Sequence, residues 1–324
     1  MTRLSVRRSA QLAVVAITIS ALIPARGVLA STPTPFAGAG TTAYAFLRLP
    51  INVRAAAMGG SGVAIAERAD AILVNPAALA DVTTSGGFAQ YANHLTDIQS
   101  GSVAYALNVT SDGRAGLGVT YLNFGGLTRT NDQAAVIGTF GAYDLAISAG
   151  YAQPVTKELS AGGAAKFIVE GIDAYTSTAF ALDAGLLWAP NSGRTRFGLA
   201  LQNVGFQSKS FSDTHRDALP MTATLGWFQK LKGAPFNISV EARAHVEGYV
   251  TAGVGVEFNK LEPFYLRVGY NTLGLKVKTG SSSDGFAGLA AGLGYNWDRL
   301  SIDYAFSSLA GLGSTHRIGV SIAL

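Results

Sequence analysis

The side chains that most often carry catalysis or bind metals are sparse in this sequence. It has no cysteine, so it lacks a disulfide framework, a thiolate metal site and a cysteine nucleophile. The glycine-rich run Gly59-Gly60-Ser61-Gly62 lacks the Gly-Lys-Ser/Thr that follows in a phosphate loop. No pair of histidines has metal-ligand spacing; the four are His94, His215, His245 and His316. We therefore expect a protein that is not an enzyme and needs neither cofactor nor metal.

A second group of reactive side chains is charged and occupies strand-like segments, where polar residues alternate with apolar ones. Both signs are present, which predicts a polar interior without the single-sign ring that selects ions. Each residue alone is more readily a cross-strand partner than a contact for cargo. The candidates for a lumen-facing row are Asp144, Lys166, Glu170, Asp183, Glu241, Arg243, Glu257, Arg267, Asp303 and Arg317.

The elements that position these charges are β-strands, because the hydrophobic residues recur with a period of two. Near the carboxyl end, Ile318, Val320 and Ile322 alternate with small or charged residues. Repetition of this pattern in many segments of about ten residues is typical of a membrane β-barrel. Fourteen strands are expected, at 86–93, 101–110, 114–124, 140–152, 158–170, 177–189, 195–205, 220–229, 235–246, 249–258, 263–271, 285–297, 299–307 and 314–324.

The connections between these strands alternate in length. Every second one is short and turn-like, whereas the longest, at 125–139, 206–219 and 272–284, belong to the other set. Short periplasmic turns opposite longer outer loops are the asymmetry expected of an outer-membrane barrel. The sequence thus predicts an all-β fold, a 14-stranded antiparallel transmembrane β-barrel over 86–324, in the outer membrane of a bacterium.

Composition agrees with this interpretation. Of 324 residues, 48% are hydrophobic and only 14% are charged, against roughly 25% charged in average soluble domains. A soluble β-sandwich or an extracellular β-solenoid is the alternative. Outward rows this rich in apolar and aromatic side chains would aggregate in water, so membrane lipid is the expected partner of that surface.

Residues 1–30 have the features of a secretory signal peptide. Arg3, Arg7 and Arg8 precede an apolar stretch, and Val28-Leu29-Ala30 provides a small-residue cleavage signal. These thirty residues carry four basic side chains and no acidic ones. Removing them takes the formal net charge from +4 to about zero. The mature chain therefore offers no basic patch for nucleic acid.

The segment 31–85 differs from the strands. It is rich in Gly, Ala and Pro, and its weaker periodicity predicts compact turns and short helices. A segment that precedes the first strand of a wide barrel can fold into the lumen as a plug, or hatch. Gly59 and Gly60 permit close backbone approach to the wall, and Asn75 can cap the amides that follow Pro76. The alternative for Asn75-Pro76-Ala77 is an ordinary surface turn.

Motifs at both ends of the mature chain resemble those of the PorV/PorQ (UPF0164) outer-membrane proteins. The amino-terminal motifs span 46–48, 54–64 and 75–80, and the carboxyl-terminal ones span 303–306 and 312–319. The resemblance implies kinship with FadL-type fourteen-stranded barrels, whose hatch contains an Asn-Pro-Ala motif. Asn75-Pro76-Ala77 matches that motif, while Ala78 stands where many members have Gly.

The resemblance implies two functions. As in PorV, the barrel would be a non-enzymatic accessory of type IX protein secretion, with channel subunits and exported proteins as partners. As in FadL, it would instead take up hydrophobic small molecules such as long-chain fatty acids. We favour transport or secretion across the outer membrane, with the FadL-like channel as the alternative.

Overall fold

The computed structural model of the chain describes residues 40–190, 193–212, 214–277 and 280–324. The predicted signal peptide and the first residues of the 31–85 segment lie outside this part. Within the described residues, no helix is both long enough and apolar enough to span a membrane.

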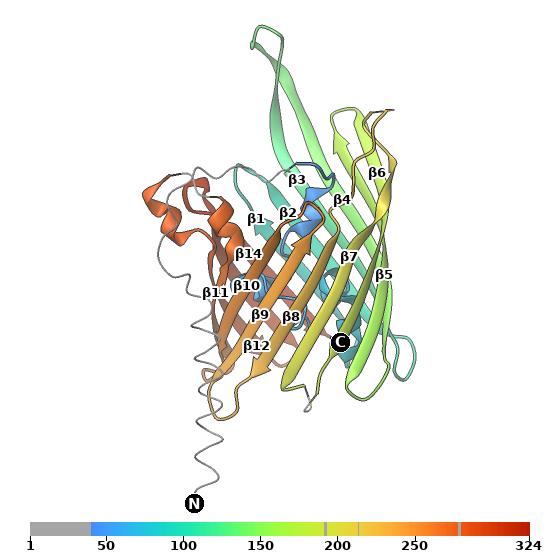
Figure 1. Ribbon diagram of the computed structural model, residues 1–324, viewed down its shortest axis with the longest axis vertical. Helices are drawn as coiled ribbons and strands as arrows, with labels where there is room; N and C mark the ends of the chain where they lie inside the picture. The colour runs from blue at the N-terminus through green and yellow to red at the C-terminus, as the bar shows by residue number, and fades with distance from the viewer. Residues whose placement is uncertain (1–39, 191–192, 213, 278–279) are drawn as a thin grey trace, which may run out of the picture. The chain divides into compact units, whose positions relative to one another are not determined.

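Fourteen antiparallel strands pair with their neighbours in chain order, and β1 pairs with β14, which closes the sheet into a barrel (Figure 1). The predicted all-β, fourteen-stranded closed fold is thereby confirmed. The strands are β1 (Gly86–Asn93), β2 (Gln99–Asn108), β3 (Arg114–Thr130), β4 (Val136–Pro154), β5 (Leu159–Ile172), β6 (Tyr175–Trp188), β7 (Thr195–Lys209), β8 (Thr222–Lys230), β9 (Phe236–His245), β10 (Val250–Phe258), β11 (Phe264–Asn271), β12 (Leu289–Trp297), β13 (Leu300–Ser308) and β14 (Ser314–Ala323).

Burial alternates along the strands with the period that the sequence predicts. In β6 the exposed residues include Phe180, Leu182 and Leu186, whereas Asp183 between them is buried. The outer face of the wall is therefore apolar, and the polar and small residues point inward.

The three long loops predicted from the sequence differ in the structure: those at 125–139 and 206–219 are shorter, and the one at 272–284 is longer because β12 begins at Leu289. Most of 125–139 is strand, and β3 and β4 continue into a hairpin that rises above the rest of the barrel (Figure 1). Leu127 pairs with Phe140 there, and the Arg129 guanidinium lies 5.5 Å from the Phe140 ring centroid. These cross-strand contacts extend the ladder beyond the segment that hydrophobic alternation alone marks.

The connections predicted at 206–219 and 272–284 also differ from the sequence-based expectation. In 206–219 the first four residues belong to β7, because Phe206 and Gln207 continue the ladder with β6. The 272–284 connection and the predicted start of the next strand contain two short 3-10 helices, η3 (Thr272–Lys276) and η4 (Ser282–Phe286). The Asn271 and Ser281 side chains cap them by accepting backbone N–H bonds, as glycine- and serine-rich segments allow. Another 3-10 helix, η5 (Ala310–Leu312), joins β13 to β14.

Candidate functional site

The N-terminal segment, defined here as residues 40–85, packs against the inward-facing side of the barrel wall. It contains η1 (Ala45–Arg48), α2 (Val53–Ala57), α3 (Ala71–Val74) and η2 (Pro76–Asp81). Helix α2 contacts β11 to β14, whereas η2 contacts β3 to β6 on another part of the wall. Figure 1 shows this segment in blue, surrounded by strands. The candidate site is therefore the space between this segment and the wall.

Asn75, Pro76 and Ala77, singled out in the sequence, lie at the start of η2. The Asn75 side chain accepts from the Ala77 amide at 3.2 Å and donates to Val63 O at 2.9 Å and Leu186 O at 3.3 Å. Pro76 occupies the first helical turn, where its missing N–H leaves no donor unsatisfied. Asn75 thus ties η2 both to the rest of the segment and to strand β6.

Two glycines of the wall make room for this motif. A Cβ on Gly162 would lie 2.6 Å from the Pro76 carbonyl carbon, and one on Gly185 would overlap the Asn75 Oδ1. The backbone of the segment therefore approaches the strands more closely than any other residue type would permit.

Gly59 and Gly60, the other two predicted motif residues, have positive φ values of 71° and 85°. A Cβ on Gly59 would lie 2.7 Å from Val254 O, so this turn also presses its backbone against the wall. Next to it, the Glu241 carboxylate accepts from the amides of Gly62 at 2.7 Å and Val63 at 2.8 Å. Glu241 is one of the predicted inward-facing charges, and here it holds the segment directly.

Five charged residues form a network at the half of the wall nearer the short turns. Arg54 of α2 binds both oxygens of Glu257 at 2.8 Å, and Arg267 donates to the same carboxylate at 2.7 Å. Arg267 also reaches Asp303 at 2.5 Å, and Asp303 lies 3.3 Å from Arg68. Burial opposes the charge of Arg54, but Glu257 and Glu67 overcome it and raise its pKa above the ordinary value. The network joins the segment to β10, β11 and β13.

A second cluster joins the segment to β7. Arg196 lies 2.8 Å from Glu67 and 2.7 Å from Asp81. Burial disfavours ionised Glu67, but Arg54 and Arg196 outweigh it and hold the pKa of this carboxyl below its usual range. Both acids belong to the segment, so this arginine is a wall residue that anchors it.

At the opposite half of the wall, near the longer loops, the contacts are fewer. Arg48 of η1 pairs with Glu247 in the β9–β10 loop, and Thr42 donates to the same carboxylate at 2.7 Å. Tyr44 bonds to Ser177 of β6. These contacts fix the beginning of the segment to this end of the barrel.

Among the residues that the structure describes, the remaining predicted inward charges form no ion pair with the N-terminal segment. Lys166 pairs with Asp183 at 2.7 Å across the sheet, and Arg243 pairs with Glu241 at 2.7 Å. Asp144 lies opposite Glu170 in the ladder, and both are acids. The structure therefore brings together Glu257, Arg267, Asp303 and Glu241, but leaves Asp144, Glu170 and Arg317 outside those clusters.

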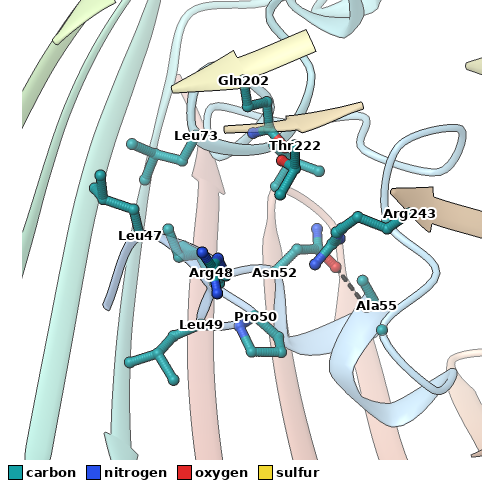
Figure 2. A pocket seen from close by; sticks show the side chains of 14 residues that line it. Leu47, Arg48, Leu49, Pro50, Asn52, Ala55, Leu73, Gln202, Thr222 and Arg243 are labelled. Carbon is teal, nitrogen blue, oxygen red and sulfur yellow. Dashed lines mark hydrogen bonds between the residues drawn. The ribbon is translucent and has the colours of Figure 1, made fainter. Parts of the chain in front are cut away.

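The space between the N-terminal segment and the wall is divided into separate cavities. A cavity of about 40 Å³ lies between η1, α2 and the wall residues Gln202, Thr222 and Arg243 (Figure 2). Arg48 and Asn52 occupy its centre in this view, and the dashed line marks the bond from the Ala55 amide to Asn52. Two polar cavities of about 270 and 300 Å³ share Glu67 and Arg68 in their lining. An apolar cavity of about 180 Å³ adjoins η3.

Several residues of these clusters escape sequence reasoning. Arg54, Glu67, Arg68 and Asp81 lie in the segment of weak periodicity, and Arg196 stands at the start of a strand. The available signal was that apolar segments of a membrane protein rarely carry charges unless those charges are paired or functional. Among the described residues, no three His, Cys, Asp or Glu side chains gather in a way that could hold a metal ion.

No protein-family model matches the chain, and no curated protein matches it in sequence. Several solved structures match the chain in fold. The Pseudomonas putida toluene transporter TodX has a TM-score of 0.57 at 14% identity, covering 83% of this chain and 96% of that one. The CymD monoaromatic hydrocarbon channel has a TM-score of 0.58 at 12% identity, covering 85% of this chain and 97% of that one. A Pseudomonas aeruginosa FadL homologue has a TM-score of 0.53 at 12% identity, covering 84% of this chain and 98% of that one.

At these identities the likeness concerns the fold alone. The predicted relation to FadL-type barrels is confirmed at that level. Membership of the PorV/PorQ family is not confirmed and stays a prediction, because no family model matches the chain.

Proposed function

We propose that this chain is a bacterial outer-membrane channel for small hydrophobic molecules, closed in this conformation by its N-terminal segment. One observation carries the proposal: a closed fourteen-stranded barrel holds that segment against its inner wall through side chains from many strands. The structural neighbours support it, since TodX is a toluene transporter and CymD a monoaromatic hydrocarbon channel. This gives the channel alternative more support than the secretion function.

The outer-membrane location is supported by the outer face of the barrel. Large apolar side chains are exposed on strand after strand, for example Leu182, Leu225 and Val268 at 60% or more of their surface. In water such a surface would associate with other copies, whereas a lipid bilayer covers it. Outer-membrane lipid is accordingly the partner of this face.

The N-terminal segment is proposed to act as the hatch, with the barrel domain beginning at residue 86. Glu241, Glu257 and Arg196 hold it through ion pairs and hydrogen bonds. Buried apolar residues of the segment, such as Ile72 and Leu79, also pack against the wall, so a shift of the hatch would have to break both kinds of contact. Cargo would enter near the longer loops and leave on the side of the short turns once the hatch shifts. Asn75, Pro76 and Ala77 are proposed to hold the hatch against β6.

The experiment is an uptake assay in a bacterial host that lacks channels of this kind. Cells that express the chain should take up radiolabelled toluene faster than cells that express an unrelated porin at equal level. Deleting residues 40–80 should raise permeability to small polar dyes, provided that the barrel still shows heat-modifiable gel migration. A folded barrel with unchanged toluene uptake would reject the channel, and a folded deletion variant that stays closed to dyes would reject the hatch.

The secretion accessory is kept as a second candidate because of the β3–β4 hairpin. Its tip exposes Val136 and Ile137 at 70% and 60% of their surface, and it rises above the other strands (Figure 1). An exposed apolar tip suits contact with another protein. Native mass spectrometry of the gently extracted protein separates the two candidates: co-purifying channel subunits or exported proteins favour secretion, and a lone barrel with a small apolar ligand favours the channel.

A further inference from the structure

The apolar cavity beside η3 differs in character from the other spaces in the barrel. It has a volume of about 180 Å³, and its lining includes Leu49, Pro50, Leu273 and Leu309. Leu49 and Pro50 belong to the N-terminal segment, whereas Leu273 and Leu309 come from the loops after β11 and β13. The cavity therefore lies where cargo from the longer-loop end would first meet the segment.

One charged side chain lines this cavity. Arg317 of β14 is 95% buried, and no described carboxylate lies within ion-pair distance of it. Its Nη1 donates to the Ser307 hydroxyl at 3.4 Å, and its Nε has no hydrogen-bond partner. A buried guanidinium with no counter-ion among the described residues is costly, so its presence calls for an anionic partner from outside the chain.

The other titratable side chain of the lining, His94, carries no charge that could pair with Arg317. His94 bonds to the Ser100 hydroxyl at 2.8 Å, and burial together with the charge of Arg317 lowers the pKa of His94 to about 4. His94 is therefore uncharged near pH 7. The remaining described lining is apolar or carries neutral polar groups.

We propose that this cavity binds a compact monocarboxylate, with the carboxylate on the Arg317 guanidinium and the apolar body against Leu273 and Leu309. Guanidinium groups recognise carboxylates through two parallel hydrogen bonds. Within the described chain the Arg317 guanidinium makes a single hydrogen bond, to Ser307, so it has donor capacity left for such a ligand. This inference deepens the proposed function and rests on it, because it names the class of molecule that the channel takes.

The volume of the cavity limits which monocarboxylates can fit. An engineered apolar cavity of about 150 Å³ holds one benzene molecule. A space of about 180 Å³ therefore accommodates a single ring with its carboxylate, or an aliphatic acid of similar bulk, whereas an extended long-chain fatty acid would project beyond it. Benzoate is the simplest probe of this size, and benzamide is its uncharged counterpart of nearly the same shape.

The test measures binding of benzoate and benzamide to the full-length barrel in lipid nanodiscs by titration calorimetry at pH 7. We expect benzoate to bind at least about tenfold more tightly than benzamide. Arg317→Met should abolish that preference, and Arg317→Lys should keep part of it. Arg129→Gln, which removes an exposed cation from the β3–β4 hairpin, serves as the matched control and should leave the preference unchanged.

A second variant tests the site without changing residue 317, in case the Arg317 variants fail to fold. Leu273→Trp fills the cavity from a loop and leaves every strand intact, so it should weaken both probes. Heat-modifiable migration verifies that each variant is folded.

The outcomes separate this inference from the proposed function. Equal binding of the two probes, or a preference that survives Arg317→Met, would overturn the carboxylate site while toluene uptake by cells still supports the channel. Loss of toluene uptake with benzoate binding intact would overturn the channel and leave the site. Binding unaffected by Leu273→Trp would place the probe elsewhere and also reject the proposal.

Discussion

Arg267 and Arg317 stand at inward-facing positions of the same wall, on β11 and β14, and both are at least 95% buried. Their surroundings are opposite. Arg267 lies between Glu257 and Asp303, at 2.7 and 2.5 Å, whereas Arg317 has a single long bond to a hydroxyl. The buried charge of Arg267 is thus neutralised within the chain, whereas that of Arg317 has no counter-ion among the described residues. The contrast teaches that the first arginine holds the structure together and the second is available to a ligand.

The sharpest test of this contrast replaces each arginine by methionine and measures unfolding in urea. Arg267→Met breaks a buried network and leaves Glu257 and Asp303 with fewer cations, so it should lower the free energy of unfolding by about 3–5 kcal/mol. Arg317→Met removes an unpaired charge and should leave stability unchanged or raise it. Comparable losses for the two variants would contradict the distinction.

A second test adds a cation on the opposite face of the same strand. Val268 neighbours Arg267 but is exposed outward at mid-strand. If that face meets lipid, Val268→Arg should cost about 2–4 kcal/mol, whereas Val250→Arg, at the end of β10, should cost roughly 0–1 kcal/mol. Folding into lipid vesicles across a urea series measures both. Similar costs at the two depths would speak against a bilayer around the barrel.

The contact between the N-terminal segment and the wall near η2 depends on close approach rather than charge. Gly162→Ala places a Cβ against Pro76 and Ala77, and we expect a loss of about 1–3 kcal/mol from overpacking together with increased dye permeability. Gly163→Ala is the matched control, because the nearest atom to its Cβ lies 3.6 Å away. Equal permeability of the two variants would show that η2 does not close the lumen.

The smallest expected effect concerns the Arg48–Glu247 pair near the longer loops. Burial opposes ionisation of Glu247, but hydrogen bonds from Thr42 and Arg48 lower its pKa in the folded state. A lowered folded-state pKa stabilises the fold above the unfolded value of about 4.3 and loses that contribution as pH falls further. Glu247→Gln should therefore lower the urea midpoint at pH 6 and have less effect at pH 3. A difference that does not depend on pH would reject ionisation as the cause.

Much of the barrel was predictable because the strand pattern is local. Hydrophobic alternation can be recognised from consecutive residues alone. It therefore predicts both the strands and the face on which Asp303 or Arg317 lies. The β3–β4 hairpin was not predictable in full, because its extension depends on pairing across the turn, as between Leu127 and Phe140, and not on alternation along one segment.

The site was predictable only in part for a related reason. The sequence marks Asn75-Pro76-Ala77 as a motif, but not that Leu186 accepts a bond from Asn75 or that Gly185 leaves space for it. Partners such as Arg54 and Glu257 are 203 residues apart, and no local rule connects them. The strand pattern cannot reveal that no carboxylate of the described part of the chain pairs with Arg317, since this requires knowledge of every neighbour.

The same separation has a consequence for the order of folding. Arg54 needs Glu257, and the amide of Gly62 needs Glu241, 179 residues further along the chain. Contacts over such separations form late, because a long loop must close before they stabilise anything. β1 must also wait for β14 before the wall closes. The N-terminal segment leaves the ribosome before the strands do, yet it docks last, onto a wall that must already be assembled around it.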